Sequence, residues 1–303
     1  MSRAADGRDI AGLSWGSNHF HAYRIGADGA LVDCYSHPRG VLSMDRRAMA
    51  EAAGEVVGRW PGLSNIWASG MIGSSLGWAE VPYAQAPVGR DEIVAAAPLM
   101  TIGGVDIRIV PGITCTRTTD AEPDVLRGEE VELLGIMRGQ DDMIAILPGA
   151  HPKWLSLRQG RVTDFFTSLN GEIYNQVTKQ GLLASITGDE AEDGDAFREG
   201  VRVGRLQPLT LGTLLFGVRA RVIRNTLPKD DASSYLRGLL IGSELADGER
   251  LLPDFASARV AVIGGGALAN LYVAALAVQA IPAQLVDPQA ARVAGFHALN
   301  RLH

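Results

Sequence analysis

The segment LSWGSNHFHAYRIGADGALVDCYS, residues 13–36, carries the pattern that decides the fold. An apolar strand predicted over residues 10–15 ends in a tight glycine turn at residues 16–18. Alternating side chains then predict two strands joined by a hairpin over residues 20–35. A helix with its N-cap at the first position follows over residues 45–60. The order is strand, glycine turn, strand, hairpin, strand, helix.

The same order returns half a chain later. A strand is predicted over residues 143–147, a tight turn over residues 148–151, two hairpin strands over residues 154–167 and a helix over residues 171–183. Two copies of one plan indicate a duplicated domain, the alternative being a chance match of two common meanders. Two such turns facing across a cleft could hold a nucleotide's phosphates, because turn amides attract anions.

Composition narrows the function classes. The chain has 303 residues, 47% of them hydrophobic and 20% charged, with a net charge of −6. This length suits two domains, and the charge favours neither a nucleic-acid nor a membrane partner. The most apolar stretch, residues 267–286, is interrupted by polar residues, as in a buried helix and strand. Cys34 and Cys115 lack a CxxC pattern and are typical of reduced thiols in a cytoplasmic protein.

Two further sequence features bear on metal binding and on dinucleotide binding. His19 and His21 share a strand face without a third ligand at metal spacing, so we assign no metal-ligating residues. The run VAVIGGGALAN, residues 260–270, fits the dinucleotide fingerprint, with Asp287 placed as the ribose acid. Only sixteen residues follow Asp287, too few for the rest of such a sheet. We therefore expect an adenosine site here, the alternatives being a structural glycine turn or a dinucleotide site.

Taken together, the motifs resemble a known family. They are WGS (15–17), GMIGSSLGW (70–78), RGEEVELLG (127–135), ILPGAHPKW (146–154), NGEIYNQV (170–177), LRGLLIGSEL (236–245) and VIGGGALANLY (262–272). The chain is similar along nearly its whole length to the 2-dehydro-3-deoxygalactonokinase family of actin-like and hexokinase-like ATPases. GMIGSSLGW and RGEEVELLG are the specific motifs, whereas the triple glycine is not.

The resemblance implies an α/β fold of two ribonuclease-H-like domains around a central cleft. Residues 1–136 would form the substrate side with the first phosphate turn, and residues 137–303 the second phosphate turn with the adenosine site. It implies ATP and Mg²⁺ in the cleft and transfer of the γ-phosphoryl group to the 6-hydroxyl of 2-dehydro-3-deoxy-D-galactonate, in galactonate catabolism. The partners would be this sugar acid and ATP, with a possible homodimer.

Phosphoryl transfer needs positioned phosphates, cations and help in deprotonating the acceptor. The predicted phosphate-binding residues are Ser14, Gly16, Ser17, Asn18, Gly149, Ala150 and His151. The predicted catalytic residues are Glu129, Glu130 and Lys153, with either glutamate as the general base or as a ligand of a magnesium-bound water. The predicted adenosine-site residues are Gly264, Gly265, Gly266 and Asn270. The predicted substrate-binding residues are Ser69, Met71, Gly73, Ser74, Trp78, Arg117 and Arg127, either arginine being a candidate for the substrate carboxylate.

Each of these positions also has a structural interpretation. The two acids after Gly128 could simply favour a helix N-terminus, Lys153 could be a solvated strand residue, and Arg117 a surface residue. The sequence also departs from the family pattern. Ser14 stands where the family has an aspartate that holds a magnesium-bound water, and Ala150 where it has threonine. The second hypothesis is therefore a kinase-like protein that binds a sugar acid or nucleotide without efficient turnover.

Overall fold

The computed structural model describes residues 9–137, 142–188, 190–206 and 208–301. The first sheet has the strand order β3-β2-β1-β4-β8-β7. Its strands are β1 (Ile10–Trp15), β2 (Phe20–Ile25), β3 (Leu31–His37), β4 (Ile66–Gly70), β7 (Leu99–Ile102) and β8 (Val105–Ile109). The second sheet has the order β15-β14-β11-β12-β13-β6. Its strands are β6 (Val88–Gly89), β11 (Met143–Leu147), β12 (Lys153–Arg158), β13 (Arg161–Thr167), β14 (Arg259–Ile263) and β15 (Ala283–Val286).

The two sheets repeat one plan. Strand β1 is antiparallel to β2 and parallel to β4, and β11 is antiparallel to β12 and parallel to β14. Both central strands are almost wholly buried, as expected for sheets covered on both faces. The duplication predicted from the sequence is confirmed, and the two turns that follow β1 and β11 occupy equivalent places.

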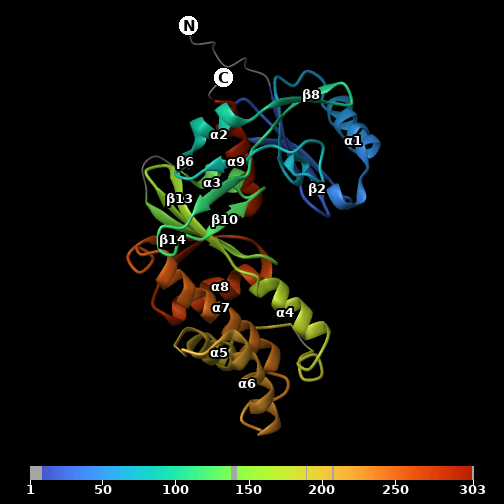
Figure 1. Ribbon diagram of the computed structural model, residues 1–303. Helices are drawn as coiled ribbons and strands as arrows, with labels where there is room; N and C mark the ends of the chain where they lie inside the picture. The colour runs from blue at the N-terminus through green and yellow to red at the C-terminus, as the bar shows by residue number, and fades with distance from the viewer. Residues whose placement is uncertain (1–8, 138–141, 189, 207, 302–303) are drawn as a thin grey trace.

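The helices cover these sheets and extend the second half. They are α1 (Arg46–Arg59), α2 (Arg90–Ala96), α3 (Glu130–Ile136), α4 (Asn170–Lys179), α5 (Asp195–Leu206), α6 (Leu211–Ile223), α7 (Ala232–Leu251), α8 (Gly266–Val278) and α9 (Pro288–Asn300). A small sheet is formed by β5 (Ala84–Gln85), β9 (Ile113–Thr116) and β10 (Pro123–Leu126). Helices α4 to α7 lie at the end of the molecule away from α1 (Figure 1). In the described part of the chain, no helix combines the length and apolar composition needed to cross a bilayer.

The last helix returns to the first half. Helix α9 packs on α3 and on β1, and Figure 1 shows it in the upper lobe beside α2. A Cβ added at Gly135 would overlap the carbonyl oxygen of Ala291, and one at Gly295 would overlap that of Val131. The two helices therefore cross with their backbones in contact, which brings the N-terminal turn of α9 to the space between the sheets.

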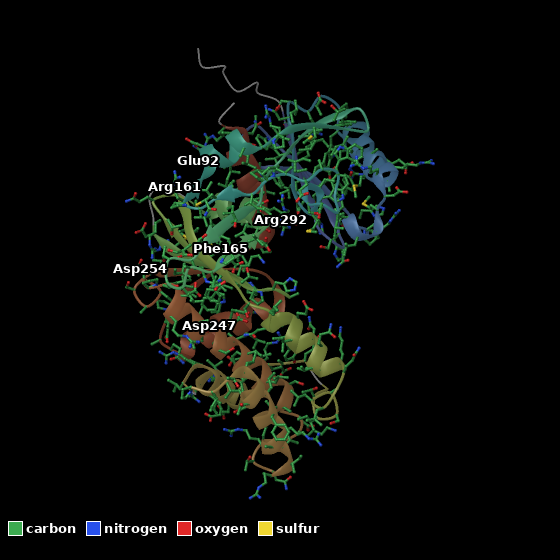
Figure 2. All side chains as sticks on the ribbon, viewed as in Figure 1. Glu92, Arg161, Phe165, Asp247, Asp254 and Arg292 are labelled. Atoms are coloured by element: carbon green, nitrogen blue, oxygen red, sulfur yellow. The ribbon has the colours of Figure 1, made fainter. Side chains whose placement is uncertain are left out.

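A second connection joins the halves. Strand β6 pairs with β13, and Arg161 of β13 forms an ion pair with Glu92 of α2 at 2.7 Å, both labelled in Figure 2. Elements from each half are thus built into the other. The predicted division into residues 1–136 and 137–303 stays a prediction.

Most predicted elements were correct within two residues, but α4 differs. The helix predicted over residues 171–183 spans Asn170–Lys179. Gly181 follows it with φ of +82°, a left-handed conformation that ends helices. Leu169 occupies the N-cap position of α4, and the backbone N–H of Asn170 donates to Ser168 Oγ at 3.1 Å.

Candidate active site

A cleft of about 650 Å³ lies between the two glycine turns. Among the predicted site residues, those that line it are Ser14, Gly16, Ser17, Met71, Arg127, Glu129, Gly149, Ala150, His151, Lys153, Gly264 and Gly265. A larger cavity of about 880 Å³ lies around β15 and the start of β14. It contains none of the predicted site residues, and Arg259 is the one charged residue among its described lining residues, so we place the chemistry in the smaller cleft.

The first turn is held by the segment that follows β3. The backbone N–H groups of Val41 and Leu42 donate to the carbonyl oxygens of Gly16 and Ser17, each at 3.0 Å. The Gly16 N–H donates to His19 O at 2.9 Å and closes the turn. Asn18 is exposed beside the turn and is not part of the cleft lining. The turn is therefore a rigid loop whose cleft side consists of small residues.

The second turn rests on the N-terminus of α4. The Glu172 N–H donates to Ala150 O at 2.8 Å, and the Glu172 carboxylate contacts His151 Nε2 at 2.6 Å. A Cβ added at Gly171 would overlap the carbonyl oxygen of Gly149. Only glycine at position 171 allows the helix to approach the turn this closely.

Lys153 and Glu129 form an ion pair across the cleft. Lys153 Nζ lies 3.3 Å from Glu129 Oε1 and donates to His151 O at 3.3 Å. The other carboxylate oxygen, Glu129 Oε2, accepts the Arg127 N–H at 3.2 Å. The solvated-strand interpretation of Lys153 does not hold, because this residue is buried and its side chain faces the cleft.

Glu130 occupies a different environment from Glu129. It is fully buried and is not part of the cleft lining. Its Oε2 accepts the Gly128 N–H at 2.5 Å, while burial, with Glu129 nearby, raises the pKa of its carboxyl to about 8. Of the two predicted candidates for the general base, only Glu129 is thus placed beside the cleft.

Arg127 lines the cleft without a carboxylate partner among the described residues. Its Nη2 donates to Val81 O at 2.7 Å, and its guanidinium stacks on the Tyr83 ring at 4.2 Å. Its Nε and Nη1 are buried and have no hydrogen-bond partner in the described part of the chain. A Cβ added at Gly73 would lie 2.9 Å from Nη1, so the 69–78 loop packs directly against this arginine.

Other predicted residues lie outside the cleft lining. Ser69 is buried, Ser74 donates to Met71 O at 2.7 Å, and Trp78 stacks with Arg46 at 4.9 Å. Arg117 is held by Asp120 at 2.9 Å and Asp124 at 3.5 Å.

The residues predicted for the adenosine site differ in whether they reach the cleft. Gly264 and Gly265 reach the cleft, whereas Gly266 begins α8 with φ of +69° and Asn270 is exposed one turn later. Asp287, the acid of the dinucleotide alternative, instead caps α9 by accepting the Ala290 N–H at 2.7 Å.

Sequence reasoning missed a second ion pair in the cleft. Arg292 of α9, labelled in Figure 2, donates from Nε and Nη2 to Glu132 Oε1 at 2.9 and 2.6 Å. Its Nη1 donates to the Tyr23 hydroxyl at 3.0 Å. Glu132 and Arg292 both line the cleft. No sequence signal joined them, because they lie 160 residues apart and α9 was not predicted.

The cleft lining contains carboxylates of the kind that bind Mg²⁺ together with phosphates. Mg²⁺ keeps most of its water and is bound through one or two carboxylates together with substrate phosphates. The described lining residues include two carboxylates, Glu129 and Glu132. Within the described ranges, no three His, Cys, Asp or Glu side chains form a group that could hold a metal ion by themselves.

Comparisons with known proteins converge on one enzyme class. A family model described as 2-keto-3-deoxy-galactonokinase matches residues 14–299. A probable 2-dehydro-3-deoxygalactonokinase of Rhizobium meliloti is 31% identical, in an alignment that covers 96% of this chain and 96% of its own. The 2-dehydro-3-deoxygalactonokinase of Escherichia coli K12 is 31% identical over 77% of this chain and 78% of its own.

Among solved structures, one carries the name of the same enzyme class and a more distant one shows the fold alone. A Sinorhizobium meliloti crystal structure, provisionally assigned to the same enzyme class, is 30% identical with a TM-score of 0.87 and covers 97% of this chain and 98% of its own. Component A of the Acidaminococcus fermentans (R)-2-hydroxyglutaryl-CoA dehydratase shares the fold, with a TM-score of 0.51 at 12% identity over 97% of both chains.

Proposed function

The chain belongs to the 2-keto-3-deoxy-galactonokinase family, a family of ATP-dependent sugar-acid kinases, and we propose that its acceptor is 2-dehydro-3-deoxy-D-galactonate. The prefixes 2-keto in the family name and 2-dehydro in the acceptor name denote the same compound. The fold is that of the actin-like and hexokinase-like ATPases, as the resemblance implied. The product is the sugar acid phosphorylated at its 6-hydroxyl, with ADP as the second product.

The observation that carries the choice of a sugar acid is the uncompensated charge of Arg127. The cleft cations Lys153 and Arg292 each have a glutamate partner, whereas Arg127 has none among the described residues. A guanidinium binds a carboxylate with two parallel hydrogen bonds, and a neutral sugar could not supply that partner. This favours an acceptor that carries its own carboxylate over a neutral hexose.

The reaction assigns a role to each side of the cleft. The two glycine turns would hold the phosphates, with Lys153 as the cation beside them. The 6-hydroxyl oxygen attacks the γ-phosphorus while the bond to the β–γ bridging oxygen breaks and ADP leaves. Glu129 would accept the hydroxyl proton through Oε1, while its contact with the Arg127 N–H keeps the carboxylate oriented.

Magnesium would neutralise charge on the phosphates when it is bound with ATP. Two carboxylates line the cleft, Glu129 and Glu132, and they are the candidates for holding its water shell. The adenosine would lie beyond the second turn, near Gly264 and Gly265. The predicted homodimer and the cytoplasmic location stay predictions.

The function is tested by ADP release from Mg-ATP with 2-dehydro-3-deoxy-D-galactonate, compared in wild type, Arg127→Lys and Arg117→Lys. Arg127→Lys should raise the KM for the sugar acid by about 10- to 100-fold, because a lysine cannot form the planar two-bond contact. Arg117→Lys is the matched control, since this arginine lies outside the cleft lining, and it should leave the KM unchanged. Wild-type protein that binds the sugar acid but releases no ADP would instead establish the binding-protein hypothesis raised by Ser14 and Ala150.

A further inference from the structure

The two carboxylates of the cleft differ in what they can still bind. Both oxygens of Glu129 are engaged, one by Lys153 and one by the Arg127 N–H. Glu132 directs one oxygen, Oε1, to both donors of Arg292, and its Oε2 has no hydrogen-bond partner among the described residues. A buried acceptor without a partner is costly and indicates a water or ion at that position.

Glu132 is built into the cleft wall with little freedom to move. It is 6% exposed, and Arg292, which holds it, is itself fixed by the Tyr23 hydroxyl. The pair joins α3 to α9 at the place where these helices cross with their backbones in contact. Such a carboxylate is preorganised, because its position does not have to be created when a ligand binds. Burial raises the pKa of the Glu132 carboxyl, while the charge of Arg292 acts in the opposite direction and favours the ionised form.

The position of this carboxylate is beside the first glycine turn. A Cβ added at Gly12 would meet the ring of Phe296, so this face of β1 looks onto α9. Ser14 is two residues further along the same strand face, and Arg292 is one helical turn before Phe296. Ser14, Glu132 and Arg292 all line the same cleft. The turn itself supplies no carboxylate, and Glu132 brings one to its side from α3.

We propose that Glu132 is the carboxylate that accepts hydrogen bonds from the water shell of the nucleotide's magnesium ion, with Arg292 and Tyr23 as positioning residues. The inference rests on the proposed function, because it requires a magnesium nucleotide in the cleft. It explains how a phosphate turn with serine at position 14 can still serve a magnesium-dependent reaction. The acid function then lies on α3, which packs on α9, instead of on β1.

The test is ADP affinity, measured by titration calorimetry with magnesium chloride and again with EDTA, in the absence of sugar acid. Wild type should bind ADP more tightly with magnesium chloride than with EDTA. We call the ratio of these two affinities the magnesium advantage. Glu132→Gln should reduce that magnesium advantage by about tenfold, as loss of outer-shell partners typically does, and leave the affinity in EDTA unchanged. Glu249→Gln is the matched control, because Arg205 holds Glu249 Oε1 by the same two donors at 2.8 and 2.7 Å outside the cleft.

A rescue experiment makes the result specific. Ser14→Asp in the Glu132→Gln background should restore the magnesium advantage, because it returns a carboxylate to the same side of the turn. If Glu132→Gln fails to fold, Glu132→Asp should lose part of the advantage. The proposal is overturned if the magnesium advantage persists in full in Glu132→Gln or Glu132→Asp, if affinity falls equally in EDTA, or if wild type shows no advantage. Failure of phosphoryl transfer to the sugar acid would contradict the proposed function and leave this binding measurement unaffected.

Discussion

Glu129 and Glu130 are neighbours in the sequence, yet the fold gives them opposite surroundings. Glu129 lies at the cleft between Lys153 and the Arg127 N–H, whereas Glu130 is fully buried beneath the N-terminus of α3. The RGEE motif therefore supplies one candidate reactive group and one group that shapes the backbone at Gly128. Substitutions at these two positions should affect different measurements.

At Glu129 the predicted effect is on turnover. Glu129→Gln should lower kcat by about 10²- to 10⁴-fold, the usual contribution of a general base, with a smaller change in the KM for the sugar acid. Steady-state ADP release measures both parameters. A variant that keeps wild-type kcat would remove Glu129 from the proton transfer.

At Glu130 the predicted effect is on the pH dependence of stability. The carboxyl pKa is about 8 in the fold and 4.5 in the reference state, so between these values the folded state binds more protons than the unfolded state. The Glu130 contribution to stability is thus full below pH 4.5 and declines as the pH rises towards about 8. Urea unfolding at several pH values should show a weaker decline for Glu130→Gln than for wild type. Parallel pH profiles would contradict a protonated Glu130.

At the scale of elements, the second phosphate turn depends on how closely α4 approaches it. The contact requires a glycine at position 171, and the Glu172 N–H then reaches Ala150 O. The sequence predicted the turn and the helix but not their direct contact. The geometry of the second turn therefore depends on its contact with α4.

Gly171→Ala should therefore disturb nucleotide binding. The added methyl group would push α4 from the turn, and we expect the KM for ATP to rise about tenfold, because small misplacements in such sites are costly. Gly212→Ala is the control, since a Cβ there meets nothing within 4 Å. Unchanged KM in Gly171→Ala would show that the turn holds its shape without the helix.

At the scale of the whole molecule, the two halves are joined by the crossing of α3 and α9. Both cleft ion pairs that span long sequence distances depend on elements held by this crossing, since Glu129 and Glu132 lie on or beside α3 and Arg292 on α9. The packing at Gly135 and Gly295 leaves no room for a side chain. The part of the cleft that is lined by residues of α3 and α9 is therefore also part of the interface between the halves.

Gly295→Ala should weaken this interface. We expect unfolding free energy to fall by about 1–3 kcal/mol, the usual cost of overpacking, with a lower Tm in thermal unfolding. Gly54→Ala in α1 provides the comparison, because its added Cβ meets nothing within 4 Å. Equal Tm values for Gly295→Ala and wild type would mean that the helices separate without cost.

Much of this protein follows from the sequence alone. The strands β1 and β11 were predicted with their observed bounds, because alternation and flanking turns are local signals that survive in any tertiary setting. The repeated meander identified the duplicated fold, and the glycine turns and the RGEE motif identified the cleft. The turns and the RGEE motif could be recognised because each consists of residues only a few positions apart in the sequence.

Only the tertiary structure decided which charged groups meet. The pairs Lys153–Glu129 and Arg292–Glu132 and the solitary charge of Arg127 could not be predicted, because each depends on which distant elements pack together. The same holds for the assignment of Glu129 to the cleft and Glu130 to the interior. Local sequence determines backbone conformation over a few residues, whereas burial and electrostatic pairing depend on contacts between segments that may be 160 residues apart.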